Sequence, residues 1–328
     1  MQCLVAGSWT TSRRELLAGA AGGVAARALL PASASAAAIP TDKRPDVVHR
    51  GRALALAGGG AVIVVAHHAR RTLTVTDRRS GRRASVALAG QPLELAVSPH
   101  SILVAVTTAF WDHPGLELLH VRGATRRARL DAGAAPFAPA FTHNRRHLLV
   151  TGGEQDGALR ILAAPDFARV RVVALGRVPR GLAVTRDDHA AWVALHAEDA
   201  VVRVALRSGH VTRRVATPPL PDRLALSPDG RRLLVSHGGR TASTLSEIDT
   251  HTGHVRALAA GDHVSAVAWG PRGQRLAALG KANAILAIDR RGRRRRLATV
   301  TAPRGLAVAG RHAFTVSAIT GRVGRVRT

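Results

Sequence analysis

The chain has 328 residues, a formal net charge of +27 at pH 7 and a single cysteine, Cys3. Because Cys3 lies in a terminal segment that we expect to be removed, the remaining chain has no disulfide bond and no thiolate site. That remainder is long enough to bury one core. Beyond residue 38 no stretch is apolar enough to span a membrane, so we expect a soluble mature protein.

Residues 1–38 have the pattern of a targeting segment. Arg13 and Arg14 precede an apolar, glycine-interrupted stretch at 16–30, and small residues near 36–38 offer cleavage sites. The motif Ser-Arg-Arg-Glu-Leu-Leu resembles a twin-arginine export signal, which implies a periplasmic or extracellular location. The alternative is an ordinary secretory signal that happens to contain two adjacent arginines.

The stretch 221–258 predicts four short strands joined by three turns. Residues 223–227 alternate apolar and polar positions, and the sequence SPDG at 227–230 has proline and glycine where a turn requires them. A more apolar run at 232–236, an alternating run at 244–249 and a last run at 254–258 follow. Four antiparallel strands in about 40 residues are typical of a β-propeller blade.

This pattern recurs along the chain with intervals of 40 to 44 residues. The equivalent anchor positions, each just before a first strand, are Gly51, Pro92, Pro136, Pro179, Pro221, His263 and Pro303. The last repeat has only three strands, and residues 46–49 look like an isolated fourth strand. The sequence therefore predicts an all-β fold, a seven-bladed β-propeller over residues 39–328 that the strand at 46–49 closes by completing the last blade.

Arginine supplies nearly all the positive charge, since Lys43 and Lys281 are the only lysines. Removing residues 1–38 deletes three arginines and one glutamate, a net +2, and leaves +25. Codon bias and a functional basic surface both explain this composition. In either case we expect association with anionic polymers at low salt. Specific nucleic-acid binding is disfavoured by the export signal and the few aromatic residues, and we expect a monomer.

Loops that follow the second strands and precede the first strands should share one face, around the mouth of the central channel. Their polar residues are the candidate ligand-binding set: His67, His68, Trp111, Asp112, His113, Glu154, Asp156, Arg180, His196, Glu198, Asp199, Arg223, His237 and Arg304. Histidines and carboxylates on one rim suit a divalent metal or a general base. The alternative is that they hydrogen-bond neighbouring blades. No metal is assigned, no cofactor is required, and no catalytic motif is present.

The aromatic residues divide into two groups. Trp192 and Trp269 fall within predicted strands, which indicates packing between blades. Trp111 lies in a predicted loop beside Asp112 and His113, where it serves either as a ligand platform or as an anchor for the loop.

The strand endings at 62–67 and 233–237, the segments at 72–81 and 244–253, and the PRGLAV sequences at 179–184 and 303–308 resemble the YVTN-type β-propeller repeat. Histidines replace the asparagine that ends the motif, at His67 and His237. The resemblance implies an exported propeller that binds a protein partner or an anionic envelope component. The repeats are also similar to those of lactonase-type propellers, which implies hydrolysis of sugar lactones. In that hypothesis the rim histidines and Glu154 or Glu198 act on the substrate, and Arg180 and Arg304 hold its acidic group. A propeller subunit of a periplasmic redox enzyme is the third hypothesis.

Overall fold

Seven antiparallel sheets follow one another along the part of the chain that the computed structural model describes, which is residues 51–99, 103–108, 113–238, 245–258 and 263–328. The strands of blades one to four are β1 (Gly51–Ala57), β2 (Val62–His67), β3 (Thr72–Asp77), β4 (Arg83–Ala87), β5 (Pro92–Val97), β6 (Leu103–Thr108), β7 (Gly115–His120), β8 (Thr125–Leu130), β9 (Pro136–Phe141), β10 (His147–Gly152), β11 (Ala158–Ala163), β12 (Ala168–Ala174), β13 (Pro179–Val184), β14 (Ala190–Leu195), β15 (Ala200–Ala205) and β16 (Val211–Ala216).

Blades five to seven contain β17 (Pro221–Leu226), β18 (Arg232–His237), β19 (Leu245–Asp249), β20 (Val255–Ala257), β21 (Val264–Trp269), β22 (Arg275–Leu279), β23 (Ala284–Ile288), β24 (Arg294–Ala298), β25 (Pro303–Ala309), β26 (His312–Ser317) and β27 (Val323–Arg327). Three single 3₁₀ turns, η1 (Gly58–Gly60), η2 (Arg122–Ala124) and η3 (His196–Glu198), lie in connections. Each strand pairs antiparallel with the next within its blade.

The predicted seven-bladed propeller is confirmed. Six of the seven anchor positions are the first residue of a first strand, and the seventh, His263, directly precedes β21. The last blade has three described strands, β25 to β27. The closing strand predicted at 46–49 lies outside the described residues.

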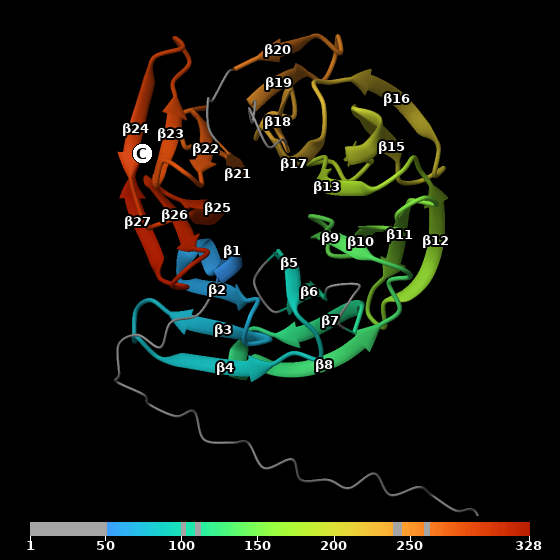
Figure 1. The fold of residues 1–328 in the computed structure, drawn as a ribbon. Coiled ribbons are helices and arrows are strands. Elements are labelled where there is room, and N and C mark those ends of the chain that lie inside the picture. Colours follow the sequence, from blue (N-terminus) through green and yellow to red (C-terminus); the bar gives the residue numbers. More distant parts are fainter. Residues whose placement is uncertain (1–50, 100–102, 109–112, 239–244, 259–262) are drawn as a thin grey trace, which may run out of the picture. The chain divides into compact units, whose positions relative to one another are not determined.

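The first strands of the blades line the centre of a ring, where each contacts the first strand of the next blade (Figure 1). The ring closes because β1 packs against β25 of the last blade. Leu54 and Val65 of blade one share a buried cluster with Phe314 and Val316 of blade seven. The described part of the chain is therefore a closed ring, whichever segment completes the outer edge of blade seven.

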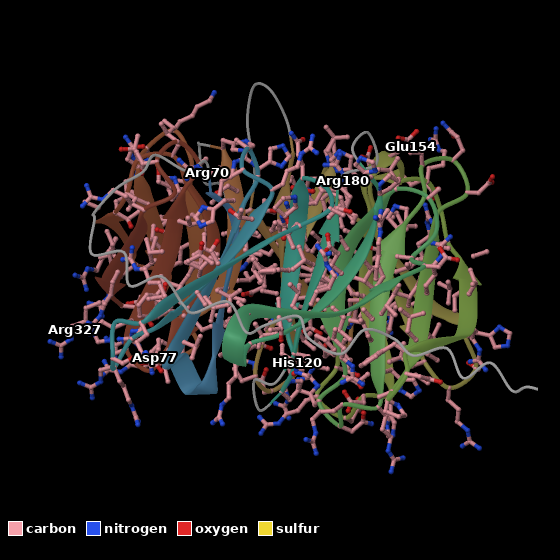
Figure 2. The ribbon with its side chains drawn as sticks, turned by 90° about the horizontal axis from the view of Figure 1, so that it is seen from below. Arg70, Asp77, His120, Glu154, Arg180 and Arg327 are labelled. Atoms are coloured by element: carbon pink, nitrogen blue, oxygen red, sulfur yellow. The ribbon has the colours of Figure 1, made fainter. Side chains whose placement is uncertain are left out.

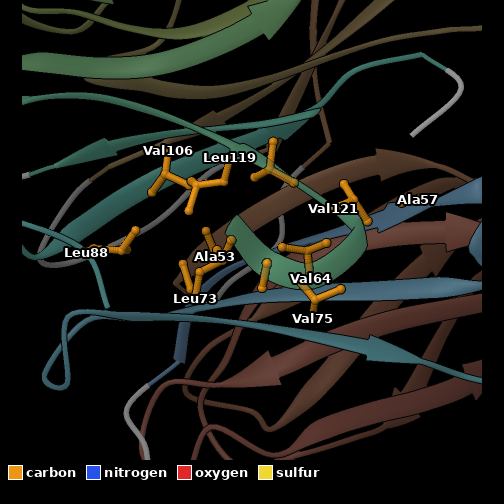
Figure 3. Close-up of a cluster of buried hydrophobic side chains, with 12 residues drawn as sticks. Ala53, Ala57, Val64, Leu73, Val75, Leu88, Val106, Leu119 and Val121 are labelled. Atoms are coloured by element: carbon orange, nitrogen blue, oxygen red, sulfur yellow. The ribbon is translucent and has the colours of Figure 1, made fainter. Parts of the chain in front are cut away.

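The hydrophobic core is divided among the junctions between blades. Each junction holds its own cluster of buried residues, contributed by facing sheets. Figure 3 shows the cluster between blades one and two, where Val64 and Leu73 meet Val106 and Leu119. This layered packing explains why the middle strands are apolar on both faces, because each middle strand is covered by a blade on either side.

Both tryptophans that were expected to pack between blades do so. Trp192 on β14 is only 1% exposed and packs against Leu233 and Val235 of the next blade. Trp269 on β21 joins the cluster between blades five and six, and its indole nitrogen donates a hydrogen bond of 2.8 Å to the carbonyl of Ala225. The predicted role of these two residues is confirmed.

Every first strand has a register irregularity close to its start, as in β13 between Pro179 and Leu182 and in β17 between Pro221 and Leu224. Such bulges change the direction in which side chains point. Gly181 occupies one of these irregular positions, where an added Cβ would lie 2.4 Å from the carbonyl oxygen of Asp222. Glycine is therefore required there for the first strands of neighbouring blades to approach closely.

The ring has two faces with different connections. Arg70, Glu154 and Arg180 lie at one face in Figure 2, and Asp77, His120 and Arg327 at the other. We call the first the rim face; it carries the starts of the first strands and the loops after the second strands. We call the second the turn face; it carries the connections between first and second strands and between third and fourth strands. In the described residues, no helix has the length and apolarity to cross a membrane.

Candidate functional site

Side chains from four first strands meet at the rim face, at the starts of the strands where the bulges occur. They are Glu94 on β5, Phe137 on β9, Arg180 on β13, and Asp222 and Arg223 on β17. Nη1 of Arg180 lies 3.2 Å from Oδ1 of Asp222, and Nη2 of Arg223 lies 2.5 Å from Oε1 of Glu94. We call these five residues the channel cluster.

The pair formed by Arg223 and Glu94 crosses the centre of the ring. Arg223 belongs to blade five and Glu94 to blade two, and the strands β17 and β5 lie on opposite sides of the central opening in Figure 1. Both side chains are about one-fifth exposed, at 18% and 21%. An ion pair shielded to this degree is screened much less by salt than one on the outer surface. It therefore ties non-adjacent blades together.

Phe137 lies beneath both guanidinium groups of the cluster. The guanidinium carbon of Arg180 is 5.2 Å from the ring centroid and that of Arg223 is 4.9 Å away. A cation within about 6 Å of an aromatic face is attracted by the ring quadrupole. The phenyl ring of Phe137 therefore attracts both guanidinium groups and keeps them close together although both are positively charged.

Two donors in this cluster are left without an acceptor. Nε of Arg180 and Nη1 of Arg223 are buried and have no hydrogen-bond partner among the described residues. Buried polar groups are nearly always paired, so an unpaired guanidinium N–H indicates a place where an acceptor belongs. An acceptor from outside the described residues, a water or a ligand oxygen, would satisfy them.

Asp222 and Arg223 stabilise each other's charged forms. Burial raises the pKa of Asp222, but the charges of Arg223 and then Arg180 outweigh burial and hold that pKa below its usual value. Burial also lowers the pKa of Arg223, and the carboxylates of Asp222 and Glu94 more than restore it. Asp222 and Arg223 are thus both charged at neutral pH.

The predicted histidines mostly serve as links between neighbouring segments. Nδ1 of His68 lies 3.0 Å from the carbonyl oxygen of Pro92, and Nδ1 of His196 lies 3.0 Å from that of Pro221, so each bonds the start of the next blade. His67 bonds the hydroxyl of Thr74 through Nε2 at 3.0 Å.

His237 is buried and forms two hydrogen bonds. Its Nδ1 lies 3.2 Å from the carbonyl oxygen of Pro219, to which it donates, and its Nε2 accepts from the hydroxyl of Ser246 at 2.7 Å. This arrangement fixes the neutral tautomer with the proton on Nδ1. The alternative that rim histidines hydrogen-bond the neighbouring blade therefore holds for His68 and His196, whereas His67 bonds within its own blade and His237 bonds the connection between blades four and five.

Lowering the pH from 7.5 to 5.5 is expected to destabilise the fold. Burial lowers the pKa of both His237 and His196 below their ordinary value. Below about pH 6.5 the unfolded chain therefore binds more protons than the folded protein. The contribution of the two neutral histidines to the free energy of unfolding is thus present above that pH and is lost as the pH falls. Urea unfolding at the two pH values measures it. His237→Gln should reduce the loss, whereas His210→Gln, at an exposed turn, should leave it unchanged; an equal loss in all three proteins would contradict this origin.

The predicted carboxylates do not gather into one site. Glu198 pairs with Arg214 at 2.7 Å and accepts from the backbone nitrogen of Arg177 at 2.6 Å. Asp199 accepts from the backbone nitrogen of Leu220 at 2.8 Å, and Glu154 and Asp156 are exposed. Within the described ranges no group of three or more histidine, cysteine, aspartate or glutamate side chains is placed to hold a metal ion.

The remaining predicted residues have separate positions. Trp111 and Asp112 lie outside the described residues. His113 contributes its carbonyl oxygen to the hydroxyl of Thr108 at 2.7 Å. Arg304 is half-buried at the start of β25 and has no polar side-chain partner in the part of the chain that the structure describes.

Sequence reasoning missed Phe137. It follows the anchor Pro136 directly, as Arg180 follows Pro179 and Arg304 follows Pro303. Aligning the repeats on their anchors and examining the next position would have found this residue, whereas Glu94 and Asp222 can be recognised from the sequence as polar residues near the strand starts. The repeat itself indicates such residues, because the bulge directs the positions just after each anchor toward the channel.

Comparison with solved structures places this architecture among known ones. A chain of hydrazine synthase from Kuenenia stuttgartiensis matches with a TM-score of 0.78 and 15% identity, over 88% of this chain and 99% of that one. A streptogramin B lyase matches with a TM-score of 0.70 and 16% identity, over 86% and 94%. The β-propeller domain of Cps50 (Swd1) from Myceliophteria thermophila matches with 0.71 and 12%, over 85% and 97%.

What the chain shares with them is the β-propeller fold. At these identities the likeness concerns the fold alone, and the three proteins have unrelated names. No family model matches the chain, and no curated protein matches it. The function therefore has to be argued from the channel cluster and the surfaces of the ring.

Proposed function

We propose that this protein is a binding protein whose rim face receives an anionic ligand, or an anionic segment of a partner, at Arg180 and Arg223. The observation that carries the proposal is the pair of buried guanidinium donors without an acceptor, Nε of Arg180 and Nη1 of Arg223. A carboxylate or phosphate oxygen would satisfy them with charge-assisted hydrogen bonds, which are about twice as strong as neutral ones.

The surrounding charge supports an anion at this place. Asp222 and Glu94 balance the two arginines of the cluster, so the cluster alone is neutral. Arg304 adds a positive charge on another first strand, and the chain as a whole carries +27. A positive electrostatic potential raises the local concentration of anions around the propeller and speeds their association.

Binding of citrate and gluconate, measured by calorimetry at low salt, tests the proposal. Arg180→Gln is expected to weaken the affinity of the better ligand roughly tenfold, which corresponds to the loss of about one charge-assisted hydrogen bond. The matched control is Arg122→Gln, which removes the same charge from an exposed position on the turn face. An equal loss in both variants would contradict a site in the channel cluster.

A lactonase-type hydrolase of the YVTN-like kind is the second candidate, and His196 is the observation that favours it. Because Nδ1 of His196 is engaged with Pro221, its Nε2 carries the free lone pair. Burial, and next the charge of Arg180, lower its pKa, so the ring is neutral at pH 7 and can accept a proton from water. Hydrolysis of gluconolactone above the spontaneous rate, abolished in His196→Gln, would support it. A rate equal to the spontaneous one would leave binding as the function.

We further propose that the protein is exported through the twin-arginine signal at residues 1–38 and acts as a monomer on a protein or an anionic envelope component. If it instead serves as a subunit of a periplasmic redox enzyme, the protein purified after export should contain a stoichiometric metal or chromophore. Elemental analysis and an absorption spectrum of that protein distinguish the two cases.

A further inference from the structure

Three neighbouring hollows lie on the turn face of blades four to seven. The largest, of about 1150 Å³, lies between blades four and five, and one of about 790 Å³ lies at blade six. A smaller pocket of about 230 Å³ lies between them; it shares Arg232 with the first hollow and Arg290 with the second. We call these three hollows the arginine track. It is on the opposite face from the channel cluster, so it is independent of the function proposed above.

The small pocket is built around one buried carboxylate. Glu247 on β19 has a side chain only 2% exposed, and it accepts from both Nε and Nη2 of Arg275, at 2.5 and 3.1 Å. Arg256 reaches the same carboxylate at 3.3 Å. Arg275 is held further by the carbonyl oxygen of Asp289 and by the face of Trp269. Glu247 and Arg275 therefore form a rigid floor for the pocket.

The walls of this pocket carry more positive charge than the floor can neutralise. Four guanidinium groups, those of Arg232, Arg256, Arg275 and Arg290, line it together with the single carboxylate of Glu247 and His254. Their net charge is +3 with the histidine neutral. Arg232 is partly balanced by Asp249 at 3.4 Å, but Arg290 has no polar side-chain partner among the described residues.

The excess continues into the hollow at blade six. Arginine dominates its lining, with Arg272, Arg290, Arg291, Arg293, Arg294 and Arg295. The one carboxylate side chain there, Asp289, is engaged by Arg293 at 3.0 Å and by backbone nitrogens. Along β24 successive side chains point to opposite faces of the strand, so arginines on one face are about 7 Å apart. Arg290, Arg294 and Arg295 all line the hollow, which suits a ligand that carries several negative charges along its length.

The chemistry of the track favours phosphate groups without bases. The planar guanidinium fork matches a phosphate by two parallel hydrogen bonds. Single-stranded nucleic acids also require exposed aromatic side chains on which the bases stack. The track has none among the described residues, since Trp192 borders it with only 1% exposure and the chain contains no tyrosine.

We propose that the arginine track binds an unbranched chain of phosphate groups that lacks bases. One phosphate occupies the pocket between blades five and six, where it contacts Arg256 and Arg290 above the pair of Glu247 and Arg275. Neighbouring phosphates of the same chain extend into the hollows on either side. The contacts are charge-assisted hydrogen bonds, so binding is steeply weakened by salt.

Fluorescence anisotropy with a labelled inorganic polyphosphate, at several salt concentrations, tests this proposal on the whole protein. The variant Arg256→Gln/Arg290→Gln keeps the pair of Glu247 and Arg275 that supports the fold. It is expected to weaken binding at least tenfold at low salt and to lower the slope of log affinity against log salt by roughly 1 to 2. The matched control is Arg70→Gln/Arg122→Gln, two exposed arginines outside the three hollows. It should change the affinity by less than about twofold.

Three results would overturn the proposal. An equal loss in the control variant would show that polyphosphate responds only to total charge. Binding of orthophosphate, at equal total phosphate, as tightly as the chain would show that the flanking hollows do not contribute. Single-stranded DNA of equal charge binding as tightly as polyphosphate would show that bases are accepted and that the ligand is a nucleic acid. Circular dichroism of each variant confirms that the ring is intact.

Discussion

Replacing Trp192 with alanine is expected to lower the free energy of unfolding by about 3–5 kcal/mol. The side chain is 1% exposed and fills the junction between blades four and five, where it contacts Leu233, Val235 and Ile248. The change removes most of the buried surface of a large aromatic group, and the rigid strands on both sides cannot collapse into the space. Equilibrium unfolding in guanidinium chloride measures the loss as a lower midpoint.

Trp269→Phe is the matched control for this prediction. Trp269 is half-buried at the end of β21, and phenylalanine keeps most of its packing. What is lost is the hydrogen bond of 2.8 Å from the indole nitrogen to the carbonyl of Ala225, so the expected loss is about 1 kcal/mol. Similar losses in the two variants would show that the junction between blades four and five does not depend on the packing of Trp192.

The repeat was predictable because the fold is nearly one-dimensional. Each blade packs mainly on its neighbours, so one interval of about 40 residues determines the whole ring. The anchors Pro92, Pro136, Pro179, Pro221 and Pro303 each begin a first strand. Proline is suited to that place, since it needs no backbone donor at the start of a strand. Even the tryptophans could be assigned to blade junctions from the strands on which they lie.

The channel cluster was predictable only in part, because it depends on distances across the ring. Arg180 and Arg223 were named as rim residues, but the contact between Arg223 and Glu94 joins blades that are not adjacent. No repeat period encodes this contact, because it is set by the width of the channel and by the bulges near the strand starts. The repeat period also does not encode the hydrogen bonds of His196 and His237, since their acceptors are backbone carbonyls that are remote in sequence.

Replacing Arg223 with methionine is expected to cost about 2–4 kcal/mol of the free energy of unfolding. Removing one partner of a mostly buried ion pair leaves the other charge without compensation, which costs more than the pair contributes. Here Glu94 loses its contact across the channel, and Asp222 loses one of its two neighbouring arginines. Arg304→Met is the control; it removes the same group from the start of another first strand, where it has no described polar partner, and should cost less than about 1 kcal/mol.

The double variant Arg223→Met/Glu94→Gln separates the pair from the packing of methionine. If the two side chains interact across the channel, the double variant should lose less stability than the sum of the single losses. Additive losses would contradict the contact. Acid unfolding gives a second readout, because the pKa of Asp222 lies below its usual value: burial raises it, but the charges of Arg223 and Arg180 lower it by more. The stability from Asp222 is present above the unfolded pKa of about 3.9 and is lost as the pH falls through the lower folded value. Without Arg223 the folded pKa of Asp222 rises and this contribution shrinks, so the stability lost in Arg223→Met should be smaller at pH 2 than at pH 7.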